Sequence, residues 1–580
     1  MMLEVDINEA DRSFFSIWRV NVRMQTFRRE PVPENWWRLG GRGLLARILL
    51  DEVIPTCEPL GAKNKLVFAP GLLVGHMLSS CDRISIGAKS PLTGGIKESN
   101  AGGRTGLQLA QLGIKALIIE DQPELPGWWT LHLNADGVGF VLTDELAGLG
   151  VYDAAPNLVE RYGDKAAIAL IGQGGEMRLS AAGIQNLDKD RVPARIAARG
   201  GIGAVMGSKG LKAIVIDGDS GRKPPVADYE GFQAARKSYN KALLGHPQTS
   251  VYRDYSTVAM VKMCEGFGAL PTRNFSTGSF EGADRISGDT MRQVMLDRSG
   301  ECEVAHACMT GCTIQSSNVF CDSDGNEIVS PLEYETIGLM GSNLGIDDLD
   351  TIARMNWEVN DLGLDSIEIG AALGVAADAG LLEWGDGERA MALIRQIRAD
   401  SPLGRILGSG AATTGKVFGV ERVPVVKGQA LSAYDPRAIK GTGVTYATSP
   451  QGGDHTCGLT IRAAIDHTNP EGQAELSRGS QINVAGYDTL GACIFASFGF
   501  AAEMENIPAL LNARYGWRVD VDVLKNLGRE TLKLEREFNK RAGFTAADDR
   551  LPEWMTREPL PPTNAVFDVS EEDLDSVFDW

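Results

Sequence analysis

Short apolar runs separated by turn-forming residues dominate the first 219 residues. The runs are rich in β-branched residues and bounded by glycine, aspartate or proline, a pattern typical of strands. They read RISIGAKS, KALIIED, WTLHLNADGVGFVLTD, AAIALIGQ and KAIVIDG. Asn134 and Gly137 lie between two such runs and predict a hairpin turn. The polar, proline-bearing stretch of residues 218–226 predicts a domain boundary.

Beyond this boundary the apolar residues recur at helical spacing. Residues 348–363 and 365–379 each predict a helix, with Asp365 as N-cap and Gly380 as the residue after the C-cap of the second. Residues 521–542 predict a charged surface helix, and no internal repeat is evident. The pattern predicts an α+β protein, with a β-rich N-terminal domain and two mostly helical domains. The expected domains are residues 1–219, 220–420 and 421–580.

Charge excludes some classes of partner. The formal net charge is −19 and the pI about 4.9. No surplus of Lys and Arg is available for phosphates, which argues against nucleic acids and against anionic membrane surfaces. No basic start followed by an apolar run and no stretch of about 18 apolar residues is visible, so we expect a cytoplasmic protein.

Three of the nine cysteines fall close together, in CEVAHACMTGC. Cys302, Cys308 and Cys312 suit an iron–sulfur cluster, which needs four thiolates, so a further ligand must come from elsewhere. Buried structural cysteine is the alternative. The glycine-rich IGQGGE at residues 171–176 lacks the GxGxxG spacing, so no dinucleotide site is expected there.

Two polar residues are candidates for acid–base chemistry. Residues 330–333 (SPLE) predict a capping box that begins a helix, which gives Glu333 the task of closing the cap. Glu335 has no such task and is freer to serve a site. His455 lies in a glycine-rich loop beside Asp454 and is either a tuned acid–base group or an ordinary loop residue.

Two segments share a pattern, namely residues 360–365 (NDLGLD) and 488–493 (DTLGAC). Each alone is compatible with a plain loop before a helix. Their similarity favours a quasi-symmetric pair of loops that grip two similar halves of a ligand. Cys493, at the end of the second segment, is then well placed to be the remote cluster ligand.

Together these segments give the chain a resemblance to the aldehyde ferredoxin oxidoreductase family, from about Gly40 to Cys493. The motifs that carry it occur in the family's order. They are GGRGLLARILLDEV, NKLVFAPGLLVG, SSCDRISIGAKSPLTGGIKESNAGG, ARGGIGAVMGSKGLKAIVI, LEYETIGLMGSNLGI, NDLGLDSIEIG, YDPRAIKGTGVTYATSPQGGDHTCG and YDTLGACIF.

The resemblance implies a β-rich base for a bis-pterin cofactor, closed over by two helical domains. It implies tungsten or molybdenum held by four pterin sulfurs, with a [4Fe-4S] cluster near one pterin. Arg83 resembles the arginine that bridges cluster and pterin, and Glu335 and His455 match the two residues beside the metal. The resemblance implies these further cofactor contacts: Asn100, Arg199, Gly200, Gly201, Ala204, Asn360, Asp365 and Asp488.

The cluster motif departs from the family. The commoner pattern CxxCxxxC would place Ala305 first, and a related CxxxCxxxC pattern would place Ser316 third. Either way one thiolate is missing beside Cys308, Cys312 and Cys493. Cys302 is the preferred substitute. The rivals are Cys321, His306 and Ser316.

The implied reaction is oxidation of an aldehyde, with water, to a carboxylate. Glu335 and His455 would orient the carbonyl and move protons. Electrons would pass through the cluster to ferredoxin or an iron–sulfur partner subunit, in a homodimer or hetero-oligomer. Two alternatives remain, a low-potential reductase of an aromatic or other unsaturated substrate, and a non-catalytic cluster-bearing electron-transfer subunit.

Overall fold

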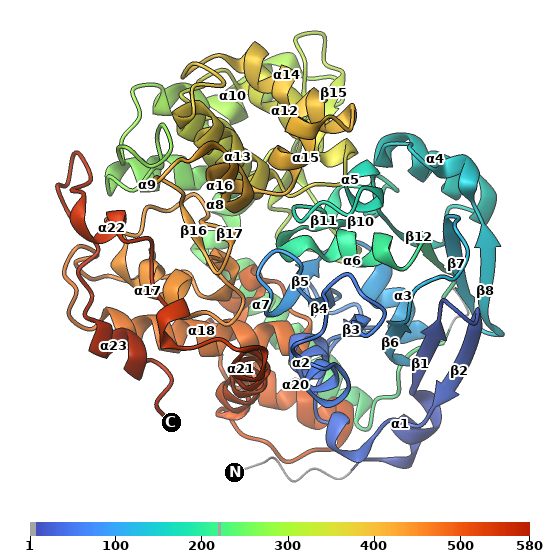
Figure 1. Cartoon of the computed structure of the whole chain (residues 1–580). Helices are drawn as coiled ribbons and strands as arrows, with labels where there is room; N and C mark the ends of the chain where they lie inside the picture. Colours follow the sequence, from blue (N-terminus) through green and yellow to red (C-terminus); the bar gives the residue numbers. More distant parts are fainter. Residues whose placement is uncertain (1–6, 219–221) are drawn as a thin grey trace.

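The structure is a computed structural model that describes residues 7–218 and 222–580. Residues 219–221, part of the predicted boundary segment, lie outside the described residues. A β-rich N-terminal part and a helix-rich remainder lie against each other (Figure 1). The predicted α+β class is confirmed.

Six strands from the first 120 residues form one sheet, in the order β2-β1-β6-β3-β4-β5. β1 and β6 run parallel, and the other neighbouring pairs run antiparallel. Helix α2 (Gly41–Glu52) follows the first two strands, and α3 (Thr105–Gln111) precedes the last. The strands are β1 (Ser16–Asn21), β2 (Thr26–Glu30), β3 (Leu66–Pro70), β4 (Ile84–Lys89), β5 (Ile96–Ala101) and β6 (Ile114–Glu120).

The second sheet repeats this arrangement strand for strand, in the order β8-β7-β12-β9-β10-β11, with β7 and β12 as its parallel pair. Helices α4 (Val151–Tyr162) and α6 (Ile202–Ser208) occupy the places of α2 and α3. The N-terminal part is therefore a duplicated unit, and the expectation of no internal repeat is wrong. The strands are β7 (Trp129–Asn134), β8 (Gly137–Leu142), β9 (Ala167–Leu170), β10 (Ile184–Asn186), β11 (Arg195–Ala197) and β12 (Leu211–Ile216).

The two sheets share one apolar core, which explains their continuous apolar runs. In β6, Leu117 and Ile119 point into the core shared with the second sheet, whereas Ala116 and Ile118 pack on the opposite face. Side chains of a strand alternate between its faces, so a strand buried on both sides is apolar throughout. The predicted hairpin is confirmed, because Asn134 pairs with Gly137 between β7 and β8.

The predicted helices are present in the remainder. Helix α12 covers Leu349–Asp361, and α13 (Ser366–Asp378) begins after Asp365, whose carboxylate accepts from Ile367 N–H at 3.0 Å. Gly380 follows the C-cap with φ 76°. The charged helix is α21 (Val523–Ala542). Among the described residues no single helix is long and apolar enough to cross a membrane. One pair of helical segments, α18 (Gln473–Leu490) and Ile494–Ala502, would be long and apolar enough together, but the pair is bent by 107°.

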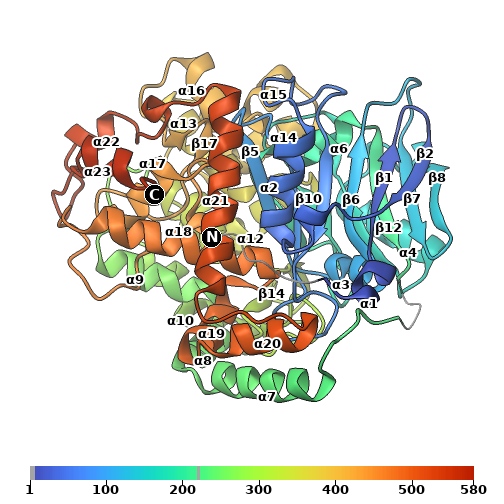
Figure 2. The same ribbon diagram turned by 90° about the horizontal axis from the view of Figure 1, so that it is seen from below.

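Two further cores hold the helical part together, and both cross the predicted domain limits. One gathers residues between 258 and 461 with C-terminal side chains such as Met555 and Phe567. The other joins the first sheet to residues 232–252 and 487–538. Helix α7 (Tyr229–Gly245) accordingly packs beside α20 (Asn506–Tyr515), as Figure 2 shows. The division at residues 220 and 420 stays a prediction.

Candidate active site

The first loop (residues 360–365) and the second loop (residues 488–493) have similar backbones. Helices α12 and α18 each end just before a left-handed glycine, Gly363 with φ 70° and Gly491 with φ 79°. A glycine in this conformation allows the last carbonyls of a helix to be hydrogen-bonded. In both loops the residue two positions later is the N-cap of the next helix. The similarity seen in the sequence thus extends to the structure.

Each loop docks on one of the two sheets through backbone hydrogen bonds. In both cases the segment between the third and fourth strands of the repeat makes these bonds, so the symmetry of the base matches that of the loops. For the first loop, Gly174 N donates to Leu362 O (2.8 Å), Gly183 N to Gly363 O (2.9 Å) and Asp365 N to Ala181 O (2.9 Å). For the second loop, Leu72 N donates to Thr489 O (3.1 Å), Leu73 N to Leu490 O (2.9 Å), Arg83 N to Gly491 O (3.2 Å) and Cys493 N to Ser80 O (2.7 Å).

Two glycines make this close docking possible. A Cβ on Gly71 would lie 2.1 Å from Gly491 N, and a Cβ on Gly172 would lie 2.5 Å from the carbonyl carbon of Leu362. Both glycines stand just after the third strand of their sheet. Backbone at this distance leaves no room for any side chain.

Asp365 and Arg199, which the resemblance names separately as cofactor contacts, form an ion pair with each other. The buried Arg199 guanidinium donates to the Asp365 carboxylate (Nε–Oδ2 3.2 Å) and to Gly453 O (2.9 Å). Gly200 and Gly201 follow with φ 80° and 74° and lead into α6, where Ala204 is buried. The Arg199 side chain thus ties the second sheet to the helical part. We expect the glycine backbone beside it, rather than the guanidinium, to contact a ligand.

Asp488 lies in a buried polar cluster below the second loop. Arg42 donates to Asp488 (3.2 Å) and, through two nitrogens, to the buried Glu535 (2.7 and 2.9 Å). Burial and the nearby Glu98 raise the pKa of Asp488 to about 8. In the first loop the corresponding Asn360 is also buried, and its carbonyl accepts from Gln185 Nε2 at 3.2 Å.

Arg83 and Asn100 form the edge of the first sheet that faces the second loop. Arg83 Nε donates to the Asn100 side-chain oxygen, and another guanidinium nitrogen donates to Asn100 O at 3.1 Å. Asn100 pairs with Ser85 in the β4–β5 ladder, which fixes its position. Arg83 acts electrostatically on both Cys308 and Cys493, so the predicted bridging arginine lies beside the predicted cluster cysteines.

Glu335 and His455 are in direct contact, although 120 residues separate them. His455 Nε2 lies 3.1 Å from Glu335 Oε1, and the other ring nitrogen lies 2.7 Å from Ser432 Oγ. Ala433 N–H donates to the second oxygen of Glu335 at 2.9 Å. The two side chains are only 17% and 16% exposed, so the pair is held in one geometry but still accessible to a small substrate.

The expected capping box at residues 330–333 is wrong. Helix α11 (Tyr334–Met340) begins three residues later, with Glu333 as an N-cap that makes no side-chain cap bond. Asn318 explains the delay, because its side chain pairs with both Leu332 N (3.0 Å) and Leu332 O (2.8 Å) and keeps the chain extended. Glu333 instead accepts from Thr257 Oγ1, and burial raises the pKa of Glu333 to about 6.

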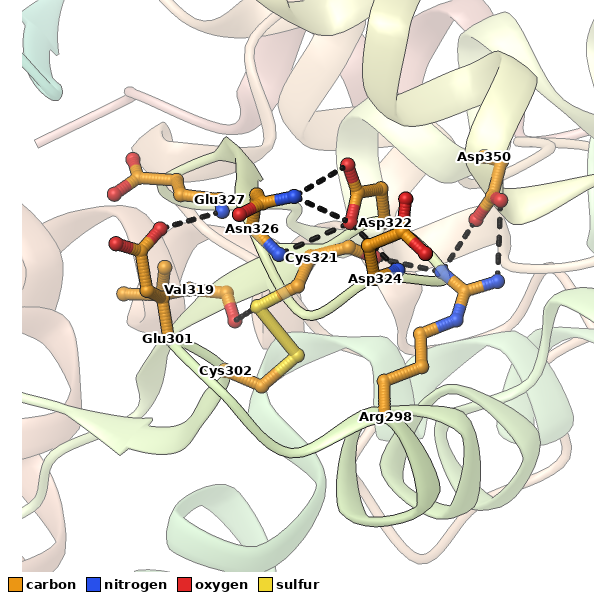
Figure 3. Close-up of a disulfide and its surroundings, with 10 residues drawn as sticks. All are labelled: Arg298, Glu301, Cys302, Val319, Cys321, Asp322, Asp324, Asn326, Glu327 and Asp350. Carbon is orange, nitrogen blue, oxygen red and sulfur yellow. Dashed lines mark hydrogen bonds and ion pairs between the residues drawn. A yellow bond between two sulfur atoms is a disulfide. The ribbon is translucent and has the colours of Figure 1, made fainter.

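The predicted cluster cysteines separate into two groups. Cys308 and Cys312 interact directly, and Cys493 lies within electrostatic range of Cys312. The structure does not bring Cys302 to them. Cys302 precedes β13 (Glu303–His306) and forms a disulfide with Cys321, at a Cα–Cα distance of 5.4 Å (Figure 3).

The other rivals for the missing ligand are no better placed. Both ring nitrogens of the buried His306 are engaged, with Glu303 at 2.6 Å and Asp188 at 3.3 Å. Ser316 is partly exposed in the loop before β14 (Ser317–Cys321). Three of the predicted cluster thiols, those of Cys308, Cys312 and Cys493, therefore lie near one another, and Cys302 does not.

The residues around the loops fit a large polar ligand. Within the described part of the chain, buried atoms without a hydrogen-bond partner include Gln185 Oε1, Gln429 Oε1 and Arg195 Nε. Gln185 donates to Asn360 O of the first loop, and Gln429 contacts Asp454 beside His455. Leaving a buried polar atom unpaired costs about 1–3 kcal/mol, so such atoms favour a bound polar group. A pterin has the many donors and acceptors that this lining can satisfy.

Sequence reasoning missed the ion pairs that support the site. Lys97 is 1% exposed at its side chain, and its Nζ lies 2.6 Å from Asp454 Oδ2. Although burial opposes charge, Lys97 and Arg199 hold the pKa of Asp454 well below its usual value. Lys97 lies within the quoted motif SSCDRISIGAKSPLTGGIKESNAGG, but a lysine in such a motif gives no sign that it is buried.

Comparison with known families covers nearly the whole chain. Residues 17–218 match the model described as "Aldehyde ferredoxin oxidoreductase, N-terminal domain". Residues 234–579 match "Aldehyde ferredoxin oxidoreductase, domains 2 & 3".

Individual relatives agree with the family match. The tungsten-containing aldehyde ferredoxin oxidoreductase of Thermococcus kodakarensis is 33% identical over 559 residues, covering 92% of this chain and 89% of the relative. A WOR-like subunit of an aliphatic sulfonate oxidoreductase from Pyrococcus furiosus is 28% identical over 73% of this chain and 71% of the relative. The solved active-site complex BamBC of benzoyl coenzyme A reductase, bound to 1,5-dienoyl-CoA, has the same fold. Its TM-score is 0.80 at 20% identity, over 97% of this chain and 93% of that one.

Proposed function

Because this chain belongs to the aldehyde ferredoxin oxidoreductase family, an oxidoreductase family, we propose that it oxidises aldehydes to carboxylates at a tungsten–pterin centre. The observation that carries this proposal is the Glu335–His455 contact of 3.1 Å between residues from distant parts of the chain. A non-catalytic electron-transfer subunit would not need a mostly buried carboxylate–imidazole pair.

The two loops and the two sheet edges would hold the cofactor. Each loop would hold one pterin of a bis-pterin centre, because each has its own docking site on one half of the duplicated base. Arg83 and Asn100 would contact the pterin at the second loop, and the backbone of Gly200 and Gly201 would contact pterin at the opposite edge. The metal, tungsten or molybdenum, would supply the two-electron redox chemistry.

Glu335 and His455 would manage the protons of the reaction. An aldehyde and water give a carboxylate, three protons and two electrons, so groups that accept protons are needed beside the carbonyl. Ser432 and Ala433 fix the far side of the pair by hydrogen bonds of 2.7 and 2.9 Å, which leaves the contact between Nε2 and Oε1 as the point of proton exchange. Positioned acid–base groups of this kind contribute about 10²–10⁴ in rate.

Electrons would leave through a [4Fe-4S] cluster held in part by Cys308, Cys312 and Cys493. Arg83 acts electrostatically on two of these thiols and donates to Asn100, so it would join the cluster site to the pterin site. The acceptor would be ferredoxin or an iron–sulfur partner subunit, since relatives are named for ferredoxin or as one subunit of an enzyme. A homodimer or hetero-oligomer is compatible with either acceptor.

Elemental analysis and a substrate comparison test the proposal. Protein purified without oxygen from a metal-sufficient host should contain about one tungsten or molybdenum per chain and reduce a viologen dye when aldehyde is added. Zinc alone, or no metal, would contradict the proposal. Aryl thioesters with a low-potential donor form the second arm. Turnover of these, with no aldehyde oxidation, would support the alternative reductase.

A further inference from the structure

The cluster site contains three predicted thiols, and a [4Fe-4S] cluster binds four. We propose that Cys81 is the fourth thiolate ligand. This inference rests on the proposed cluster but not on the identity of the substrate or of the metal. Cys81 takes the place that the sequence assigned to Cys302, because Cys302 forms a disulfide with Cys321.

The segment that carries Cys81 touches two of the other cysteines. The backbone N–H of Cys493 donates to Ser80 O at 2.7 Å, and Ser80 Oγ lies 3.5 Å from Cys312 Sγ. Ser80 adopts φ 58°, a left-handed conformation that turns the chain sharply immediately before Cys81. A short turn therefore holds the Cys81 backbone next to both the remote ligand and the local one.

The Cys81 thiol itself lies among the same residues. Its side chain is completely buried, and the thiols of Cys312 and Cys493 lie within electrostatic range of it. Its Sγ is 4.0 Å from the hydroxyl of Tyr239, which has Cys81, Cys312 and Cys493 as its charged neighbours. Cys81, Cys312 and Cys493 thus all interact with the Tyr239 hydroxyl, and Cys81 is in contact with it. Cys308 completes the set through its direct contact with Cys312.

The remaining cysteines lie elsewhere, and all nine fall within the described residues. Cys264 belongs to the other helical core, beside Tyr334. Cys457 lies near Asp454 and Arg42. Cys57 shares an apolar core with Cys81 but has Lys89 and Glu58 as its charged neighbours. Cys81 is the sulfur that matches the site in both place and chemistry.

Ligation by Cys81 would also connect the cluster to the pterin. Arg83 is two residues further along and contacts Asn100, so one short segment would carry a cluster ligand and the arginine between cluster and pterin. Each thiol loses its proton to solvent when its sulfur bonds to iron. The step involves no change in oxidation state of the protein.

The test compares three single variants of the full chain, purified without oxygen: Cys81→Ala, Cys302→Ala and Cys57→Ala. Iron and sulfide per chain and the electron paramagnetic resonance (EPR) spectrum of the reduced protein are measured. Wild type and the Cys302→Ala and Cys57→Ala controls should hold about four irons with the same spectrum. Cys81→Ala should hold about three or fewer, with the wild-type signal lost.

Each result decides between explanations. Four irons and a wild-type spectrum in Cys81→Ala would overturn the inference, as would loss of the cluster in Cys302→Ala alone or in Cys57→Ala alone. If Cys81→Ala does not fold, Cys81→Ser decides, because serine can ligate iron. An altered spectrum with iron retained supports the inference, and an unchanged spectrum refutes it. Wild type with four irons but no tungsten or molybdenum would instead refute the proposed function and leave this ligand test intact.

Discussion

Replacing Gly71 with alanine tests whether the duplicated base positions the second loop. The new Cβ would lie 2.1 Å from Gly491 N and 2.3 Å from Gly491 Cα, and backbone cannot yield as a flexible side chain can. The loop must therefore move away from the first sheet. Four backbone hydrogen bonds between residues 72–83 and 489–493 would weaken or break.

The expected loss follows from these bonds. At about 0.5–1.5 kcal/mol each, four bonds contribute about 2–6 kcal/mol. A loss of about 2 kcal/mol raises the population of the locally opened loop roughly thirtyfold, because about 1.4 kcal/mol corresponds to a factor of ten. Hydrogen exchange of the amides of residues 72–83 and 489–493 should accelerate by at least this factor in Gly71→Ala.

Two other glycines serve as controls. Gly172→Ala should free the first loop in the same way, but iron content should fall in Gly71→Ala alone, because the proposed ligand Cys493 belongs to the second loop. Gly479→Ala, in the middle of α18, meets no atom within 4 Å and should slow exchange slightly, since alanine favours helix by about 1 kcal/mol. Unchanged exchange and iron in Gly71→Ala, or equal iron loss in Gly172→Ala, would refute the reasoning.

Three further predictions concern single side chains. Glu335→Gln and His455→Ala should each lower aldehyde turnover by roughly 10²–10⁴ at unchanged metal content, and near-normal rates with full metal would remove both from the mechanism. Lys97→Met should leave the buried carboxylate of Asp454 without its main cation and destabilise the fold by about 3–5 kcal/mol, seen as a lower urea midpoint. Burial raises the pKa of Glu368 to about 7. The folded state therefore retains a proton that the unfolded state has lost, and stability should fall as pH rises from about 4.5 to about 7. Glu368→Gln should flatten that part of the stability–pH curve, and an unchanged slope would contradict this account.

Much of the fold could be predicted from local patterns. The strands before residue 219 are short, β-branched and bounded by turn residues, and α12, α13 and α21 show helical spacing with recognisable caps. The duplication shows mainly in the order of the strands, which local sequence patterns do not reveal. The clearest shared residues lie in one pair of equivalent strands, β6 (IKALIIE) and β12 (LKAIVI), and one short match does not reveal a repeated unit.

The resemblance supplied the identity of candidate site residues. The contacts that these residues make depend on segments far apart in the sequence and could not be predicted from it. Glu335 and His455, which the resemblance assigns to one site, lie in contact, while their role there stays a prediction. The capping box failed because Asn318, distant in sequence, occupies the backbone groups of Leu332. Cys302 was preferred for its nearness in sequence to Cys308, but strand β13 separates the two and aligns Cys302 with its partner on β14. Strand pairing of this kind cannot be read from spacing.

The bonds between residues 72–83 and 489–493 also set an order of events during synthesis. Cys493 follows Arg83 by 410 residues. At about 5–20 residues per second, a ribosome needs roughly 20–80 s to make the intervening chain. During that time the edge of the first sheet that carries Arg83 and Asn100 has no loop to close over it. Cofactor enclosure must therefore wait until most of the polypeptide has been made, and a chain truncated before residue 488 would lack the second loop that encloses the pterin.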